Sequence, residues 1–341
     1  MKKGPEIRVI GGASAEKKEQ AKKEIEQALF NHFESLSPQE QEQLKKFEYP
    51  KSERELALIN FANEETSRLM KEAGLEPYDV PEENFHIVPP ELYKKAAGED
   101  TTAATFNTKQ GVLFDAQHFR DNPVNFGAVA LHEMLHLKAH FSMEVEEEGE
   151  KVEKTPYREG VTVKALQKHG YHGRYHEHFA GLHEAIVAEA EKRLLVKLLD
   201  CPVLAAEKEW LMSTEAKEMK KKLAEEKGIP EDDIVWVGKK GKDDWEAVPY
   251  LQQRNVLNYV CAEIQKQFPE QFQSPDDVYK VFLKAHFTGR LLPIARLVEK
   301  TFGKGSFRLL GNMGTDKESG VLHLESLKKA RGRKMREKTD S

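Results

Sequence analysis

FGAVALHEMLHLKAH, residues 126–140, is a mostly apolar stretch that carries the pattern His-Glu-x-x-His at residues 132–136. Residues four apart lie on one face of a helix, so His132 and His136 would point the same way and can take two adjacent positions around one metal ion. Glu133 lies about 100° further round the helix, beside such an ion rather than on it. Catalytic zinc sites use three protein ligands and leave a fourth position for water. The stretch therefore predicts two ligands and requires a third from elsewhere.

The segments before the motif predict a small sheet followed by a helix. Residues 85–88 read as a strand that two prolines close, and residues 103–107 and 111–115 read as the two strands of a β-hairpin. Asn122 and Pro123 then offer an N-cap and a first-turn proline, so we expect the motif to lie on a helix that begins there.

The segments after the motif predict strands first and helices later. Residues 143–163 alternate apolar and charged positions, which is typical of a solvated β-hairpin or a pair of strands. Residues 182–199 form a strong amphipathic pattern, and from Ser213 onward the chain reads as a helical bundle. The final stretch, residues 326–341, is basic and poor in apolar residues, so we expect it to be disordered.

Glu184 is the strongest candidate for the third ligand. It falls in the first turn predicted for the helix over residues 182–199, which can approach the motif helix from the other side of a metal ion. Four alternatives stay open at this point, namely Glu159, Glu177, Glu189 and His140. His140 is disfavoured because three ligands from one straight helix give poor tetrahedral geometry.

These features resemble a zincin-like zinc metallopeptidase of the Glu-zincin type over about residues 53–199. The phrase GLHEA around Glu184 is similar to the Leu-Asn-Glu-Ala start of that family's second active-site helix, with His183 in place of the Asn. The resemblance implies a mixed sheet packed on the motif helix. It also implies that residues 111–115 form the edge strand along the active-site cleft, where an extended peptide can pair with it.

The resemblance also implies a chemistry. Zn²⁺ would be held by His132, His136 and Glu184, and the enzyme would hydrolyse peptide bonds through a metal-bound water with Glu133 as the general base. Family members stabilise the oxyanion with a Tyr, His or Arg. Candidates here include Tyr175, His176 and Arg158, and the choice among them stays open.

Two other functions remain possible from the sequence. The first is a non-catalytic protein with a structural zinc site and a helical partner-binding region. The second is a zinc hydrolase that acts on a non-peptide amide. Glu133 argues for an enzyme, because a purely structural site has no need of a base at that position.

Composition narrows the partners and the compartment. The 341 residues carry a net charge of −5 with both signs well mixed, which argues against a general nucleic-acid binder. No apolar run is long enough to cross a membrane, and the first residues lack the apolar segment of a secretory signal. Cys201 and Cys261 lie far apart and form no C-x-x-C pair, which indicates a reduced, cytoplasmic protein. The expected partner is a peptide or protein substrate, and the oligomeric state is not predicted.

Together the patterns predict an α+β protein: a zincin-like lobe, comprising a mixed sheet and the motif helix, and a mostly helical C-terminal region. The expected division is an N-terminal helical extension over residues 1–50, a metallopeptidase domain over 51–200, a helical domain over 201–325 and a basic tail over 326–341.

Overall fold

The computed structural model describes residues 7–98, 101–119, 121–149, 151–166, 175–238 and 244–339. The protein has the predicted α+β class. It divides into two compact units, each assembled from two separate stretches: residues 1–138 with 191–248, and residues 139–190 with 249–341. The sequence predicted successive ranges instead, because periodicity along the chain does not reveal which elements pack together.

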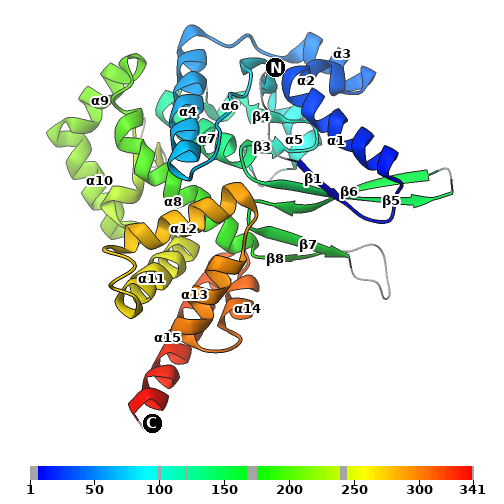
Figure 1. Ribbon diagram of the computed structural model, residues 1–341. Coiled ribbons are helices and arrows are strands. Elements are labelled where there is room, and N and C mark those ends of the chain that lie inside the picture. Colours follow the sequence, from blue (N-terminus) through cyan, green and yellow to red (C-terminus); the bar gives the residue numbers. More distant parts are fainter. Residues whose placement is uncertain are drawn as a thin grey trace. The chain divides into compact units, whose positions relative to one another are not determined.

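The first unit holds the elements that precede the motif, the motif helix itself and a later group. They are β1 (Ile7–Ile10), α1 (Ala15–Phe30), α2 (His32–Ser35), α3 (Pro38–Phe47), α4 (Glu53–Glu72), β2 (Phe85–Val88), α5 (Pro90–Ala97), β3 (Ala103–Phe106), β4 (Gly111–Asp115), α6 (Ala116–Phe119) and α7 (Pro123–Leu137), then α9 (Ala205–Met212), α10 (Thr214–Lys227), β9 (Ile234–Val237) and β10 (Trp245–Ala247). Figure 1 labels most of these elements.

A three-stranded sheet in this unit has the order β2-β4-β3, with β2 parallel and β3 antiparallel to β4. The predicted hairpin of β3 and β4 is confirmed. The prediction that residues 111–115 form the edge strand is wrong, because β4 is the central strand and β3 is an edge of this sheet. The sequence could not show this, because β4 becomes central only when β2 pairs with it. Strand β2 comes before the hairpin in the chain, and no local pattern indicates that it lies beside β4.

The sheet packs one face on α7. Phe114 of β4 and Phe126 of α7 lie in contact, with ring centroids 4.9 Å apart, and Phe85 of β2 stacks on Phe114 at 6.3 Å. Directly paired residues of neighbouring strands share a face, so Thr105 of β3, which pairs with Val112, lies on the same face as Phe114. The edge strand therefore presents Thr105 toward the motif helix.

Helix α7 begins and ends as its sequence requires. The Asn122 side chain accepts a hydrogen bond from the Asn125 backbone N–H at 3.1 Å, and Pro123 occupies the first turn, which confirms the predicted start. At the other end, the buried Lys138 ammonium donates to the Asn63 carbonyl of α4 at 3.0 Å and to Ser67 Oγ at 2.8 Å. These contacts fix the end of α7 against α4 and so position the motif.

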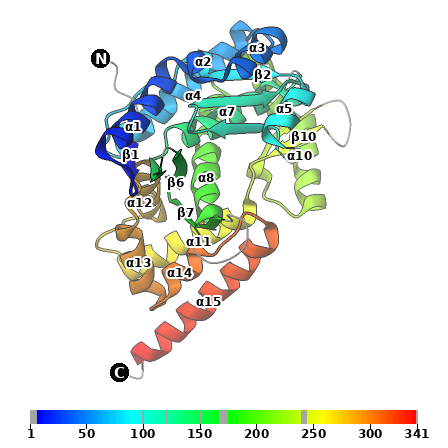
Figure 2. The same ribbon diagram turned by 90° about the vertical axis from the view of Figure 1, so that its right-hand side faces the viewer.

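The second unit combines strands and helices. Its elements are β5 (Phe141–Glu148), β6 (Lys151–Glu159), β7 (Thr162–Leu166), β8 (Tyr175–His178), α8 (Ala180–Leu198), α11 (Leu251–Gln267), α12 (Pro275–Thr288), α13 (Leu292–Phe302), α14 (Ser306–Gly311) and α15 (Lys317–Thr339). Figure 2 shows the helices α11 to α15 from a second side. The strands β5 to β8 lie next to one another in chain order, which confirms strands over residues 143–163.

Two features of the helices bear on the predictions. Helix α15 continues to Thr339, so the prediction of a disordered tail is wrong for residues 326–339. Leu327 and Ala330 are buried on α15, and these two apolar residues were too weak a signal against a basic background. Helix α8 is one continuous helix whose residues up to Ala190 belong to the second unit and whose residues from Glu191 belong to the first.

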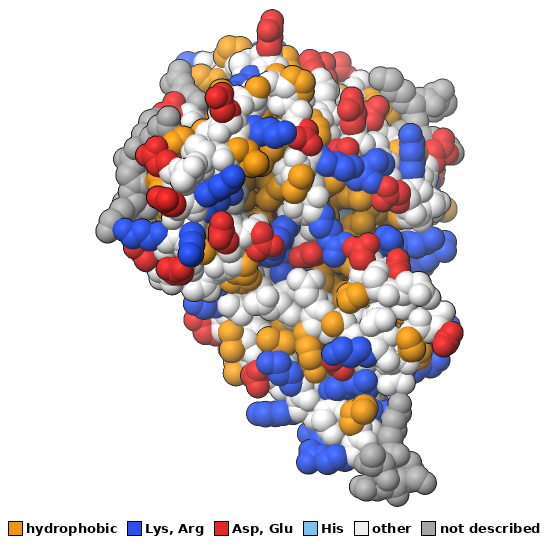
Figure 3. Space-filling model, turned by 90° about the vertical axis from the view of Figure 1, so that its left-hand side faces the viewer, with side chains coloured by type: hydrophobic (Ala, Val, Ile, Leu, Met, Phe, Trp, Pro, Cys, Tyr) orange, Lys and Arg blue, Asp and Glu red, His pale blue; other side chains and the backbone are white. Residues whose placement is uncertain are grey.

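On the face drawn in Figure 3, Lys and Arg side chains are interspersed with Asp and Glu side chains. Among the described residues, no helix is both long enough and apolar enough to span a bilayer.

Candidate metal centre

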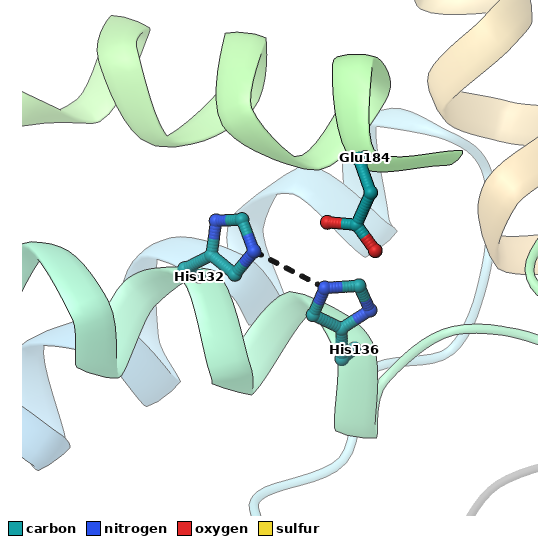
Figure 4. Close-up of side chains that lie close together, drawn as sticks. All are labelled: His132, His136 and Glu184. Atoms are coloured by element: carbon teal, nitrogen blue, oxygen red, sulfur yellow. Dashed lines mark hydrogen bonds between the residues drawn. The ribbon is translucent and has the colours of Figure 1, made fainter. Parts of the chain in front are cut away.

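Three side chains on α7 and α8 converge. His132, His136 and Glu184 each offer one ligand atom, and these atoms all lie within 4.8 Å of one another. The Nε2 atoms of His132 and His136 are 3.2 Å apart. Figure 4 shows Glu184 reaching from α8 toward the two imidazole rings on α7. The structure thus brings the residue predicted as the third ligand together with the two motif histidines.

The site is largely shielded from solvent. His132 and His136 are 9% and 8% exposed, and Glu133 is 7% exposed. Two nitrogen donors and one carboxylate oxygen form a set that suits zinc, whereas calcium and magnesium prefer oxygen ligands alone. The donor chemistry therefore fits Zn²⁺ held by these three residues.

Glu184 lies slightly deeper in its helix than predicted. Helix α8 begins at Ala180, so Glu184 falls in the second turn rather than the first. The unpaired N–H groups of a helix lie in its first turn, so their support for a negative charge is weaker at Glu184 than the sequence suggested. A bound metal ion would carry more of that role.

Glu191 holds the first motif histidine. Its Oε2 lies 2.9 Å from His132 Nδ1, and the Glu191 side chain is buried at 3% exposure. Since a carboxylate accepts the hydrogen bond, Nδ1 carries the proton and Nε2 presents its lone pair toward His136. Metal-ligating histidines usually have such a carboxylate partner, which fixes the ring and its tautomer.

The carboxylates of Glu184 and Glu191 lie on one face of α8. Seven residues separate Glu184 from Glu191, which is about 20° short of two full turns. The sequence analysis did not identify Glu191, although this seven-residue spacing between two glutamates on an apolar helix is a signal that could have found it.

Glu133 is held by the edge strand. Thr105 Oγ1 donates to Glu133 Oε2 at 2.6 Å and lies 3.3 Å from the Glu133 carbonyl oxygen. The hydroxyl fixes one carboxylate oxygen, so the orientation of the whole carboxylate is set. Sequence reasoning missed Thr105, because its role depends on β3 being the edge strand that packs against α7.

The rival ligands have other surroundings. Glu177 is exposed and lies 3.3 Å from Lys164, and the buried Glu189 accepts from Asn258 Nδ2 at 3.4 Å. His140 Nε2 lies 2.9 Å from Ser142 Oγ, and Glu159 pairs with Phe141 in the β5–β6 ladder. Within the described part of the chain, only His132, His136 and Glu184 form a group of three that could hold a metal ion.

The residues predicted to stabilise the oxyanion lie on β6 and β8. Arg158 lies on β6, where its Nη1 donates to the Gly289 carbonyl at 2.5 Å. Tyr175 and His176 belong to β8, and their side chains lie outside the described residues. The choice among the three stays a prediction. His183, next to Glu184, is buried and packs its ring 5.0 Å from that of His286.

No family model, no curated protein and no solved structure matches this chain.

Proposed function

We propose that this protein is a zinc-dependent peptidase whose metal is held by His132, His136 and Glu184. The observation that carries the proposal is the convergence of Glu184 on the two motif histidines. The packing of α7 against a mixed sheet supports a zincin-like lobe as part of the same proposal. The absence of a disulfide between Cys201 and Cys261 fits the proposed cytoplasmic location.

The roles of the residues follow from their positions. Bound zinc supplies a Lewis acid that polarises the scissile carbonyl. Glu133 takes a proton from the attacking water and delivers it to the leaving amine, and Thr105 keeps its carboxylate in one orientation. Glu191 keeps the His132 ring aligned.

The substrate would bind as an extended peptide along β3. This strand pairs with β4 on one side only in the described sheet, and it carries Thr105 beside Glu133. Backbone groups on an edge strand can pair with an added peptide strand. In this proposal β3 takes the part that the sequence analysis gave to residues 111–115.

The test is cleavage of a degenerate peptide library, with and without a chelator, by the protein and by its Glu133→Gln variant. The protein should cleave, and the chelator should stop cleavage. Glu133→Gln should keep zinc and the fold but lose roughly 10²–10⁴-fold in turnover, since only proton transfer is removed. The exposed Glu177→Gln variant is the control and should retain activity.

The outcomes separate the alternatives. Turnover that survives Glu133→Gln removes Glu133 from its role. A protein that binds about one zinc per chain but cleaves nothing in the library favours the structural-zinc or non-peptide alternatives.

A further inference from the structure

A pocket in the first unit is lined by all three tryptophans of the chain, Trp210, Trp236 and Trp245. Its volume is about 490 Å³, within the range of about 300–1,000 Å³ that is typical of small-molecule sites. The walls come from α6, the start of α7, α9 and the paired strands β9 and β10. No ligand of the candidate metal centre lines this pocket, so it is a separate site.

Two of the tryptophans are held in place through their ring nitrogens. Trp210 of α9 donates from Nε1 to the Val237 carbonyl at 2.6 Å, and Trp236 of β9 donates from Nε1 to Asp244 Oδ1 at 3.0 Å. An indole has one hydrogen-bond donor and no acceptor. These two side chains therefore offer a ligand π surface and no hydrogen bond. Because both rings are already fixed by the protein, little side-chain entropy is lost when a ligand packs on them.

Strand pairing places a carboxylate next to one of these rings. Trp236 and Glu246 are direct partners in the antiparallel β9–β10 ladder, so their side chains lie on one face with Cβ atoms about 4.5–5.5 Å apart. His118 Nε2 lies 4.0 Å from Glu246 Oε1, which is too far for a hydrogen bond. Burial raises the pKa of Glu246, His118 opposes this shift and Asp244 adds to it. A positive charge beside Trp236 would therefore also stabilise the ionised Glu246.

The charges of the lining favour a cation. The described lining residues include no Lys or Arg and four carboxylates, those of Asp121, Glu207, Asp244 and Glu246. Glu207 forms an ion pair with Arg54. Asn122, the N-cap of α7, is also part of the lining, and a helix N-terminus contributes about half a positive charge. The three other carboxylates outweigh that contribution, so an anionic ligand is disfavoured.

A quaternary ammonium suits this lining better than a primary one. Its methyl groups spread the positive charge over an apolar surface without N–H donors, and such cations bind against tryptophan faces. A primary ammonium has three donors that need acceptors, whereas Trp210 and Trp236 offer none and Asp244 already accepts from Trp236. Trp245 has Lys227 Nζ 5.4 Å from its ring centroid, so the ligand is assigned to the other two rings.

We propose that this pocket binds a quaternary ammonium group, whose methyl groups pack on Trp210 and Trp236 and whose charge is balanced by Glu246. Small choline-like molecules and trimethylated lysine side chains present the same group, so the experiment includes both. The proposal does not depend on the activity of the metal centre.

The test compares ligands that differ in the cation alone. Choline is titrated into the full-length protein beside 3,3-dimethylbutan-1-ol, in which a carbon atom replaces the charged nitrogen, and beside ethanolamine, its primary ammonium counterpart. Ligand-detected NMR gives the affinities. Tryptophan fluorescence reports the location, since all three tryptophans line the pocket. Choline should bind about tenfold more tightly than 3,3-dimethylbutan-1-ol, the gain expected for a cation against tryptophan, and more tightly than ethanolamine.

A fourth ligand identifies the source of the group. N-acetyl-trimethyllysine amide should bind more tightly than choline if the group belongs to a protein side chain, and more weakly if it belongs to a small molecule. Either order supports the proposed chemistry, provided that unmodified N-acetyl-lysine amide binds more weakly than its trimethylated form.

Variants separate the charge from the ring. Glu246→Gln keeps the size of the side chain and should weaken choline about three- to fivefold, while 3,3-dimethylbutan-1-ol binds as it does to wild type. Trp236→Leu keeps an apolar surface without a π face and should reduce the preference for choline, with the fold checked by circular dichroism. Glu209→Gln is the control, because it makes the same change in net charge at an exposed position of α9 that does not line the pocket.

Four outcomes would overturn the proposal. They are no binding of choline, equal binding of choline and 3,3-dimethylbutan-1-ol, tighter binding of ethanolamine than of choline, and the same choline affinity in Glu246→Gln and Glu209→Gln. The last of these comparisons stands even if Trp236→Leu fails to fold.

Discussion

Glu191 is the residue that most clearly separates a metal centre from a chance cluster of histidines. Its buried carboxylate accepts from His132 Nδ1 at 2.9 Å, on the side of the ring away from the proposed metal position. Metal-ligating histidines usually have such a partner, which fixes the tautomer and the orientation of the ring.

We therefore expect Glu191→Ala to lower zinc affinity about 10–100-fold, as is usual when the partner of a ligating histidine is removed. Glu191→Gln should lose less, because its amide oxygen still accepts from Nδ1–H. Competition with a fluorescent zinc chelator measures both. Equal affinity in wild type and Glu191→Ala would remove Glu191 from the site.

Glu184 is tested in the same assay. Glu184→Ala should weaken zinc binding more than Glu191→Ala does, because it removes a ligand and a neutralising charge. Glu159→Ala and Glu177→Ala should bind zinc like wild type, since neither carboxylate belongs to the convergent group. A larger loss in either control than in Glu184→Ala would show that the third ligand was assigned wrongly.

At the scale of elements, β4 illustrates how a central strand constrains its neighbours. Gly111 begins β4 directly beside the His32 ring, where a methyl group would lie 2.3 Å from Cε1. Since His32 is also tied to the Lys109 carbonyl, it cannot move away freely.

Gly111→Ala should therefore destabilise the protein by roughly 1–3 kcal/mol, the usual cost of an added methyl group in a packed core. Urea unfolding measures the change. The double variant Gly111→Ala, His32→Ala should lose less than the two single variants together, because the clash is gone. Strict additivity would mean that His32 is not what excludes a side chain at Gly111.

The sequence predicted the individual elements around the motif better than it predicted which of them lie side by side. The hairpin of β3 and β4 and the Asn122 cap of α7 were correct, because turns and caps depend on residues close in the chain. The strand order was not, because β2 reaches its place beside β4 through a parallel pairing that no local pattern specifies. Thr105 was missed for the same reason, since its contact with Glu133 follows from that order.

At the scale of the whole molecule, one buried histidine ties stability to pH. Burial, followed by the neighbouring His86, lowers the pKa of His32 from 6.5 to about 4. The unfolded chain thus binds a proton at His32 below pH 6.5 that the folded protein refuses until about pH 4. The contribution of His32 to the free energy of unfolding is complete above about pH 6.5 and is lost as the pH falls toward 4. Burial also lowers the pKa of Lys138 from 10.5 to about 7. Its contribution to the free energy of unfolding is therefore lost over a higher range, as the pH falls from 10.5 toward 7.

We expect the free energy of unfolding to fall by roughly 1.5 kcal/mol between about pH 6.5 and pH 5 on account of His32, because the slope reaches 1.36 kcal/mol per pH unit only well below the unfolded pKa. Urea denaturation at both pH values gives the difference. His32→Gln can still donate to the Lys109 carbonyl but does not titrate, so its stability should change less over this range. The same pH dependence in His32→Gln would assign the effect to other groups.

The division into units was beyond the sequence as well. Amphipathic periodicity identified the helix over residues 182–199, and the structure confirms it as α8. Periodicity does not tell which neighbour covers each end of a helix, so it gave no hint that α8 belongs to both units. The spacing of Glu184 and Glu191 could have indicated that the two carboxylates share a face of α8, but the contact of Glu191 with His132 follows from how α8 packs against α7.

The seven-residue spacing of Glu184 and Glu191 has a consequence for the evolution of this chain. Inserting or deleting one residue between them would rotate one carboxylate about 100° away from the other, so homologues that keep the centre should show no length change there. The antiparallel pair of β5 and β6 carries no such phase requirement, and insertions and deletions should accumulate between these two strands. In an alignment, homologues that have lost the centre would be recognised by insertions or deletions between these two positions.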